Sequence, residues 1–300
     1  MKAFRSGFAA VVGRPNVGKS TLMNSLLGQK VAIVSDKPQT TRNRIRCILT
    51  RPDAQIVFLD TPGIHKPLHK LGEYMVQTAL KTLNGVDAVV FVVDASQPPG
   101  RGDEFVAAQL KNSASPVILA ANKVDLWESR EKGEAILAAY RALGDFDKVL
   151  PVSALTGSGL AELANAVIER LPEGPKYYPD DWVTDHPERF IMAELIREKV
   201  LLLTREEVPH ATAVVVDRVE AREDRNLVDV WATIYVERPS QKGIIIGKGG
   251  SMLKEVGMLA RQDIEALLGS QVNLQLWVKV KEDWRERAGT LSDFGYTLES

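Results

Sequence analysis

The stretch Gly13-Arg-Pro-Asn-Val-Gly-Lys-Ser20 decides the fold of this chain. It matches the pattern Gly-x-x-x-x-Gly-Lys-Ser/Thr, in which a glycine-rich turn joins a buried strand to a helix. An apolar run over residues 8–13 predicts that strand, and residues 19–27 predict the helix. Glycines let backbone N–H groups turn inward, and the helix N-terminus adds partial positive charge, so this turn is suited to holding phosphate groups.

Two side chains of this loop carry its charged chemistry. We expect Lys19 to contact the β- and γ-phosphates of a nucleoside triphosphate, and the Ser20 hydroxyl to bind Mg²⁺. The other residues expected to line the phosphates are Gly13, Asn16, Val17, Gly18 and Thr21.

Short apolar runs alternate with longer amphipathic stretches as far as residue 170. The runs predict strands at 8–13, 45–50, 55–60, 88–94, 116–121 and 148–152. Helices are predicted near 19–27, 71–83, 103–112, 130–143 and 158–170. Most of the runs are continuously apolar and β-branched, which is typical of strands buried on both faces. The pattern predicts a P-loop α/β domain with a doubly wound, mostly parallel sheet.

Three further motifs follow predicted strands. In Asp60-Thr-Pro-Gly63, Asp60 can hold Mg²⁺ through water, and the Gly63 N–H can reach a γ-phosphate. In Asn122-Lys-Val-Asp125, the Asp125 carboxylate can accept hydrogen bonds from the N1–H and 2-amino groups of guanine, donors that adenine lacks. We expect Asn122 to brace the loop and the Lys123 stem to lie along the base. In Ser153-Ala154-Leu155, the Ala154 N–H is expected to meet guanine O6, which makes GTP and GDP the predicted ligands.

With these motifs in this order, residues 7–171 resemble the translation-factor-like GTPases. The resemblance implies a first switch over 35–46, in which Thr41 binds Mg²⁺ and its N–H contacts the γ-phosphate, with Thr40 as the alternative. It implies a second switch over 61–72. The residues expected to act in catalysis are Lys19, Thr41 and Gly63.

Many GTPases place a glutamine directly after the glycine of the Asp-x-x-Gly motif, where it orients the attacking water. This chain has Ile64 at that position. Its side chain can neither donate nor accept a hydrogen bond, so we expect slow intrinsic hydrolysis. Related GTPases with an apolar residue there often bind K⁺ through an asparagine of the phosphate loop, and Asn16 occupies that place. His65 and His69 lie in a predicted solvated loop and are not expected to act as the base.

The second half of the chain has a different order of predicted helices and strands. Residues 171–189 contain four prolines, which predicts a linker. We divide the chain into a GTPase domain at 1–172, a linker at 173–189 and a smaller α+β domain at 190–300 with a polar C-terminal tail, in which Phe294 and Tyr296 could cover either the RNA or the core. Trp277, on the last strand, is expected in the core, with a surface on which bases stack as the alternative. The sequence of the second domain predicts helices and strands in the order α-β-β-α-α-β, over 190–204, 211–220, 228–237, 240–246, 251–268 and 272–280.

Gly247-Lys-Gly-Gly250 opens the helix predicted at 251–268. Glycines at a helix N-terminus allow a phosphodiester to approach closely, and Lys248 adds charge. Residues 238–261 hold five Lys or Arg residues against Glu255 alone, which favours a groove for single-stranded nucleic acid. The residues expected to contact it are Lys242, Ile244, Ile246, Gly247, Lys248, Gly249, Gly250 and Lys254.

The glycine loop and the order α-β-β-α-α-β resemble a type II KH domain. One GTPase domain followed by one such domain resembles the Era-type GTPases, a bacterial ribosome-assembly family. The match covers essentially the whole chain, including Pro38-Gln-Thr-Thr-Arg42 and the tail Leu291-Ser-Asp-Phe-Gly-Tyr296. It implies binding near the 3′ end of 16S rRNA, assistance to small (30S) subunit assembly, and GTP favouring the RNA-bound form. An alternative stays open: a regulatory switch read by a protein or membrane partner, with the second domain as a docking module.

Length and composition set broader limits. The chain has 300 residues, a net charge of −1 and one cysteine, Cys47. This length suggests two domains, and the near-zero charge means that any attraction to nucleic acid is local. A single cysteine fits a reducing compartment, and no apolar run approaches the roughly 18 residues that span a membrane. We expect a cytoplasmic monomer, and leave open a peripheral membrane association.

Overall fold

The computed structural model describes residues 3–297, except 38, 65–66, 68 and 223–224. The chain forms two compact units. The first holds residues 1–32, 41–68 and 72–185, and the second holds 33–40, 69–71 and 186–300. Most of the predicted linker thus belongs to the first unit, and two short pieces of the predicted GTPase domain, 33–40 and 69–71, belong to the second.

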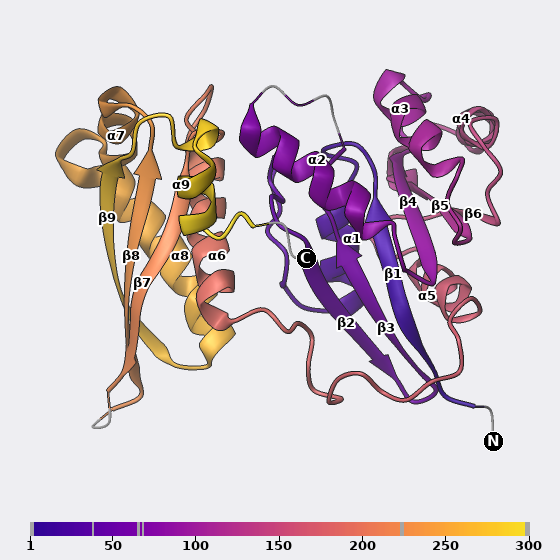
Figure 1. Cartoon of the computed structure of the whole chain (residues 1–300), viewed down its shortest axis with the longest axis horizontal. Coiled ribbons are helices and arrows are strands. Elements are labelled where there is room, and N and C mark those ends of the chain that lie inside the picture. The colour runs from indigo at the N-terminus through magenta and orange to yellow at the C-terminus, as the bar shows by residue number, and fades with distance from the viewer. Residues whose placement is uncertain (1–2, 38, 65–66, 68, 223–224, 298–300) are drawn as a thin grey trace. The chain divides into compact units, whose positions relative to one another are not determined.

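A six-stranded sheet forms the centre of the first unit, in the order β2-β3-β1-β4-β5-β6 (Figure 1). Strand β2 is antiparallel to β3, and the other neighbouring strands are parallel, so the predicted mostly parallel sheet is confirmed. The parallel strands end at one edge, where open α/β sheets bind their ligands. The strands are β1 (Arg5–Val12), β2 (Ile45–Arg51), β3 (Ala54–Asp60), β4 (Ala88–Asp94), β5 (Val117–Asn122) and β6 (Lys148–Pro151).

Helices cover both faces of this sheet, as its continuously apolar strands require. They are α1 (Lys19–Leu27), α2 (Lys70–Thr82), α3 (Arg101–Leu110), α4 (Arg130–Arg141) and α5 (Leu160–Ile168). On one face, Leu110 of α3 and Leu137 and Tyr140 of α4 pack with Phe91 of β4 in one core. Helices α1 and α5 lie on the opposite face (Figure 1).

The segment predicted as a linker runs along the first unit. The backbone N–H groups of Tyr177 and Tyr178 donate to Gln55 Oε1 at 2.8 and 3.0 Å. Ile48 N–H donates to the Val183 carbonyl at 2.8 Å. These bonds fix residues 177–183 against strands β2 and β3.

The second unit has a three-stranded sheet in the order β7-β8-β9, with β8 and β9 parallel. One face of this sheet packs on helices, where Ile196, Val230, Val256 and Ile264 share one core. The predicted order α-β-β-α-α-β is confirmed. Its elements are α6 (Glu188–Leu203), β7 (Ala213–Ala221), β8 (Leu227–Val236), α7 (Pro239–Ile246), α8 (Ser251–Leu268) and β9 (Gln271–Val280). Among the described residues, no helix is both long and apolar enough to cross a bilayer.

Residues 33–40 belong to the second unit, and from residue 35 they are part of the first switch predicted at 35–46. Ile33 is only 1% exposed and belongs to the same core as α6. Val34 N–H donates to Glu198 Oε1 at 2.9 Å, and the buried Arg197 donates to the Thr40 carbonyl. The sequence carries no local signal for this packing.

The expectation that Trp277 lies in the core is wrong, because this side chain is 45% exposed. Strand β9 alternates: Leu274, Leu276 and Val278 contact the core, whereas Trp277 points to the other face. The apolar pattern of β9 is that of a strand with helices on one side only.

The C-terminal tail is polar in composition, but its aromatic side chains pack within the second unit. Trp284 is fully buried, and its Nε1–H donates to the Ala211 carbonyl at 2.8 Å. The rings of Phe294 and Tyr296 lie 5.4 and 5.9 Å from that of Trp284, with Phe294 next to the short helix α9 (Ala288–Asp293). The tail aromatics therefore complete the fold of the second unit.

Candidate functional site

The phosphate loop joins β1 to α1. Gly18 has a φ of 96°, and a Cβ there would lie 2.4 Å from Asn122 Nδ2, so only glycine fits. Lys19 is 6% exposed, and its Nζ donates to the carbonyls of Gly13 at 3.2 Å and Arg14 at 3.1 Å. Burial lowers the pKa of Lys19 to about 8, although the charge of Asp60 opposes this shift. The ammonium is therefore held inside the loop that would surround a triphosphate.

The three residues predicted to bind Mg²⁺ lie together. Ser20 Oγ is 2.8 Å from Thr41 Oγ1, and it donates to Asp60 Oδ2 at 2.8 Å. Asp60 Oδ1 is buried without a hydrogen-bond partner among the described residues. Burial raises the pKa of Asp60 to about 6, although the charge of Lys19 opposes this shift. Mg²⁺ prefers oxygen ligands of this kind, so the donor set fits this cation.

The structure separates the two candidate threonines of the first switch. Thr41 faces Ser20, whereas Thr40 Oγ1 donates to the Lys37 carbonyl at 2.6 Å. Thr41 is 7% exposed, so its hydroxyl is held near the loop and away from solvent.

The second switch begins against the phosphate loop. A Cβ on Gly63 would lie 2.7 Å from Pro15 N, so the backbone approaches the loop where only glycine fits. Ile64 is 1% exposed, and its N–H donates to the Gly13 carbonyl at 3.1 Å. Its side chain packs into the core and offers no group to orient water. His65, which we did not expect to be catalytic, lies outside the described residues.

Asn122 braces the loops at the guanine end of the site. Its Nδ2 donates to the Val17 carbonyl at 2.9 Å, and its Oδ1 accepts the Ala154 N–H at 2.9 Å. The Ala154 N–H, expected to meet guanine O6, therefore already has an acceptor, with which O6 would have to share it. Asp125 accepts a hydrogen bond from Ser153 Oγ through one oxygen.

The remaining residues predicted to contact the nucleotide differ in how exposed they are to solvent. Leu155 is 80% exposed, whereas Ser153 and Val17 are buried. Thr21 lies half-buried in the first turn of α1, and Asn16 is exposed with a φ of 64°. The structure thus brings the nucleotide residues that we predicted to one edge of the sheet.

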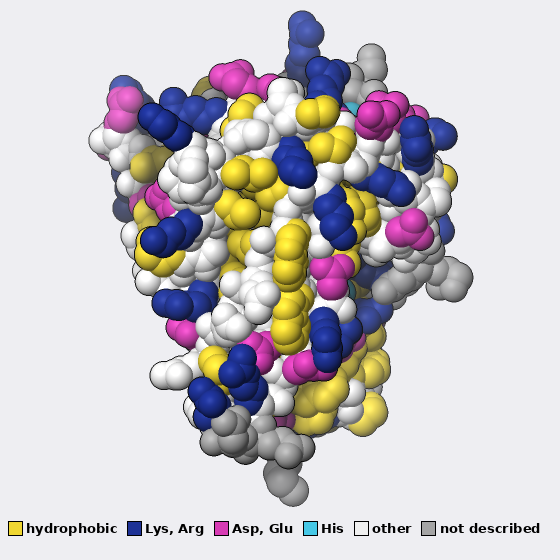
Figure 2. Space-filling model, turned by 90° about the vertical axis from the view of Figure 1, so that its left-hand side faces the viewer, with side chains coloured by type: hydrophobic (Ala, Val, Ile, Leu, Met, Phe, Trp, Pro, Cys, Tyr) yellow, Lys and Arg dark blue, Asp and Glu magenta, His cyan; other side chains and the backbone are white. Residues whose placement is uncertain are grey.

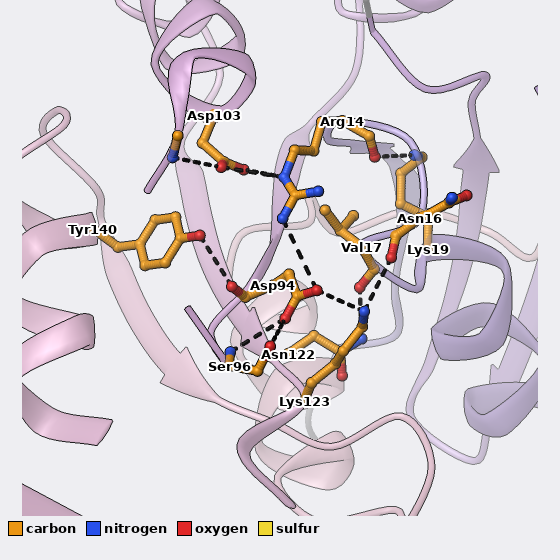
Figure 3. A network of polar contacts seen from close by, with 11 residues as sticks. Arg14, Asn16, Val17, Lys19, Asp94, Ser96, Asp103, Asn122, Lys123 and Tyr140 are labelled. Carbon is orange, nitrogen blue, oxygen red and sulfur yellow. Dashed lines mark hydrogen bonds and ion pairs between the residues drawn. The ribbon is translucent and has the colours of Figure 1, made fainter. Parts of the chain in front are cut away.

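Sequence reasoning missed three charged residues beside this site, Arg14, Asp94 and Asp103, one of which binds the predicted Lys123 (Figure 3). Lys123 Nζ is 2.6 Å from Asp94 Oδ2 and donates to the Asn16 carbonyl at 3.1 Å. Arg14 Nε donates to Asp103 Oδ1 at 3.1 Å. Asp94 ends strand β4 at the ligand-binding edge of the sheet, and that position was the available signal.

In the second unit, the Gly-Lys-Gly-Gly turn lies between α7 and α8. Gly247, Gly249 and Gly250 have φ values of 73°, 61° and 82°, in the left-handed region that favours glycine. Lys248 and Lys254 are exposed. The turn therefore presents backbone and charge to solvent at the start of α8.

A groove continues from this turn between α8 and β9. It has a volume of about 550 Å³ and includes the predicted Gly250 and Lys254. Of the isoleucines expected to line it, Ile244 is 47% exposed on α7, and Ile246 packs partly against the core. Figure 2 shows this side of the molecule, where hydrophobic side chains form a band with Lys and Arg side chains on both sides. The lining residues that we did not predict are Leu253, Gly257, Met258, Arg261, Val272, Asn273, Leu274 and Leu276.

On α8, the groove residues that we missed lie on a different face of the helix from its core residues. On α8, Leu253, Gly257 and Arg261 recur every four residues, a spacing that places them on one face of the helix. Val256, Ala260 and Ile264 lie on another face, in the core. Only the core face could be recognised from apolar spacing alone.

Two protein families match this chain. The model of the 50S ribosome-binding GTPases matches residues 8–123, and the KH domain model matches residues 207–285. GTPase Era of Alkaliphilus oremlandii is 54% identical over 293 residues, which is 98% of this chain and 99% of that protein.

Two solved structures resemble the chain over nearly its whole length. One is a crystal structure of Era in complex with MgGDPNP and nucleotides 1506–1542 of 16S ribosomal RNA; it has a TM-score of 0.95 and 41% identity, and covers 98% of this chain and 100% of that one. The other is a variant of Aquifex aeolicus Era bound to GDP·AlF4⁻, with a TM-score of 0.94, 41% identity and the same coverage.

Proposed function

Because the chain belongs to the Era family of GTPases, we propose that it couples GTP hydrolysis to the binding of ribosomal RNA during assembly of the small subunit. One observation carries the proposal: a complete guanine-nucleotide site and a KH glycine loop beside a basic groove occur in one chain that is similar to Era from end to end. The chain is a GTPase, and its RNA would be the 3′ end region of 16S rRNA, as in the related complex.

Hydrolysis at this site would depend on how the phosphates of GTP are positioned and on the positive charge around them. Lys19 would contact the β- and γ-phosphates, and the backbone N–H groups of Thr41 and Gly63 would hold the γ-phosphate. Ser20, Thr41 and, through water, Asp60 would hold Mg²⁺, which supplies positive charge to the phosphate oxygens. The buried Ile64 cannot orient water, so the intrinsic rate is slow. Asn122, Lys123, Asp125 and the Ser153–Leu155 turn would hold guanine.

RNA would bind along α7, the glycine turn and α8. The exposed Lys248 and Lys254 are placed to contact phosphates, and the half-buried Lys242 is placed on α7. Backbone groups of Gly247, Gly249 and Gly250 allow close approach. Bases would lie over the apolar floor of the groove, which Leu274 and Leu276 form with Met258, and over the exposed Ile244 and the partly buried Ile246.

Replacing Gly250 by aspartate tests the RNA site. Gly250 has a φ of 82° with open space around its Cβ, so an added carboxylate would project beside the phosphates and repel them. We expect Gly250→Asp to weaken binding of a 3′-end 16S rRNA oligonucleotide at least about tenfold, a loss of about 1.4 kcal/mol. Fluorescence anisotropy at fixed salt measures this, because such affinities depend on salt.

The matched control is Gly295→Asp, which adds the same charge in the same unit at an exposed glycine that also has a φ of 82° and open space around its Cβ. It should bind RNA as the wild type does. Equal RNA affinity for Gly250→Asp and Gly295→Asp, with both proteins folded by thermal unfolding, would contradict the assignment of the groove.

Asn16 provides a test of K⁺ dependence. Its exposed position in the phosphate loop would allow its side-chain oxygen to hold K⁺ beside the phosphates, where positive charge lowers the barrier to hydrolysis. We expect GTP turnover several-fold faster in K⁺ than in Na⁺ at equal ionic strength, and Asn16→Ala to remove the difference. Equal wild-type rates in the two salts would exclude this cation site.

We propose further that the protein acts in the cytoplasm as a monomer, and that Asp125 makes it a GTPase and not an ATPase. The main alternative is a regulatory switch whose second domain docks a protein or a membrane. The glycine turn with its left-handed φ values disfavours that alternative, since a docking module needs no backbone opening at a helix start. A domain that binds vesicles or a protein and leaves 3′-end RNA unbound would support it.

A further inference from the structure

Asp94 lies at the centre of the charged group beside the guanine site, between the phosphate loop and the Asn122–Asp125 loop (Figure 3). It ends strand β4 and is only 6% exposed. Its Oδ1 accepts the N–H and the hydroxyl of Ser96 at 3.2 and 2.6 Å, and its backbone carbonyl accepts the Tyr140 hydroxyl at 3.0 Å. These bonds hold the carboxylate in one orientation.

The other carboxylate oxygen of Asp94 binds Lys123. The distance from Oδ2 to Lys123 Nζ is 2.6 Å, and the same ammonium donates to the Asn16 carbonyl at 3.1 Å. Burial alone would raise the pKa of the Asp94 carboxyl, but hydrogen bonds from Lys123 and Ser96 outweigh burial and hold it below its ordinary value. The pair is therefore an ion pair at neutral pH, and such charge-assisted bonds are the strong ones.

Two fixed acceptors restrict a side chain that is otherwise mobile. A free lysine stem can adopt many rotamers, and ordering it on ligand binding costs free energy. Lys123 itself follows β5 with a φ of 68°, so its backbone direction is also fixed. Between this backbone and the two acceptors, the apolar stem is already ordered before any base arrives.

A second carboxylate nearby has a different partner. Asp103 accepts Arg14 Nε at 3.1 Å and caps α3 by accepting the Gly100 N–H at 3.0 Å. Arg14 Nη2 lies 3.9 Å from Asp94 Oδ2, at the limit of an ion pair. Asp103 thus shares the neighbourhood and charge of Asp94, but among the described residues it makes no contact with Lys123.

We propose that Asp94 is a positioning residue for guanine binding, which holds the Lys123 stem in place as one wall of the base site. The inference rests on the role of Lys123 at the base given under the proposed function. GDP and GTP share the base, so the effect of Asp94 falls on both nucleotides. It acts on binding, because the side-chain hydrogen bonds and ion pairs of Asp94 with described residues are with Ser96, Lys123 and Arg14, and none of these is proposed to touch the γ-phosphate.

The test is Asp94→Asn, which keeps an acceptor for Ser96 and removes the charge that holds Lys123. We expect GDP to dissociate about tenfold faster and the KM for GTP to rise about tenfold, while kcat at saturating GTP changes less than twofold. Fluorescent GDP release and steady-state turnover measure these values. Asp103→Asn, the matched control, should leave GDP release unchanged.

A double-mutant cycle separates this role from a general structural one. With Lys123→Met as the background, Asp94→Asn should change GDP release no further. The inference is overturned if Asp94→Asn has its full effect without Lys123, if Asp103→Asn has the same effect, or if kcat falls as much as KM rises. A normal GDP affinity for Lys123→Met would overturn the base-site role of Lys123, and this inference with it. A weakened Lys123→Met beside a normal Asp94→Asn would overturn this inference alone.

Discussion

Asp125→Asn should lose most of its affinity for GTP and gain affinity for xanthosine triphosphate. Asp125 is proposed to accept hydrogen bonds from two guanine donors, and bonds to a charged group contribute about 1.5–3 kcal/mol each. Their loss corresponds to a reduction in affinity of about 10²- to 10⁴-fold. Xanthine carries an oxygen in place of the 2-amino group, so an asparagine amide can donate to it.

Equilibrium binding of GTP, XTP and ATP to wild-type and variant protein measures this exchange. The variant should keep its fold, because within the described part of the chain Asp125 accepts only the Ser153 hydroxyl, through one oxygen, and an asparagine oxygen can also accept it. Unchanged GTP affinity in Asp125→Asn would show that the base is bound elsewhere, and would remove the basis for a guanine site at this loop.

Lys19→Met is expected to abolish most of the turnover. Lys19 is the buried cation of the phosphate loop, and methionine keeps its length without its charge. Removing one donor that stabilises charge in the transition state costs about 10²- to 10³-fold in kcat. Single-turnover hydrolysis at saturating GTP measures this loss separately from weaker binding.

Two controls belong with this variant. Thermal unfolding of the nucleotide-free protein checks that the loop tolerates the loss of the bonds from Nζ to the Gly13 and Arg14 carbonyls. Lys30→Met, a lysine exposed just after α1, should leave hydrolysis unchanged. A folded Lys19→Met protein with turnover within fivefold of the wild type would contradict the role of Lys19.

The nucleotide half of the fold was predictable because its signals are local. A phosphate loop needs its strand, its glycines and its helix within some twenty consecutive residues, and Gly13–Ser20 supplies that context. The carboxyl ends of parallel strands then converge, so Asp60 and Asn122 are brought together by topology alone. Strand β4, predicted at 88–94, has those bounds in the structure.

Other features depend on contacts between distant residues. Asp94 and Lys123 are 29 residues apart, and nothing in Val-Val-Asp distinguishes a positioning carboxylate from an ordinary strand end. Ile33 looks like part of the loop after α1, yet it belongs to the core of the second unit.

Strand β9 shows a different limit of sequence reasoning. Its alternation separates Trp277 from Leu276 but does not reveal which face the helices cover. Trp284 was missed because a single aromatic residue in a charged stretch has no period from which burial can be read.

The most direct test of the central claim is GTP turnover in K⁺ buffer, with and without an RNA from the 3′ end of 16S rRNA, for wild type, Gly250→Asp and Gly295→Asp. If the GTPase and RNA sites are coupled, each ligand favours the same state of the protein. We predict that RNA raises turnover of the wild type and of Gly295→Asp, and that Gly250→Asp keeps its basal rate without responding. A wild-type rate that is the same at saturating RNA as without RNA would contradict the claim that this GTPase is coupled to RNA binding.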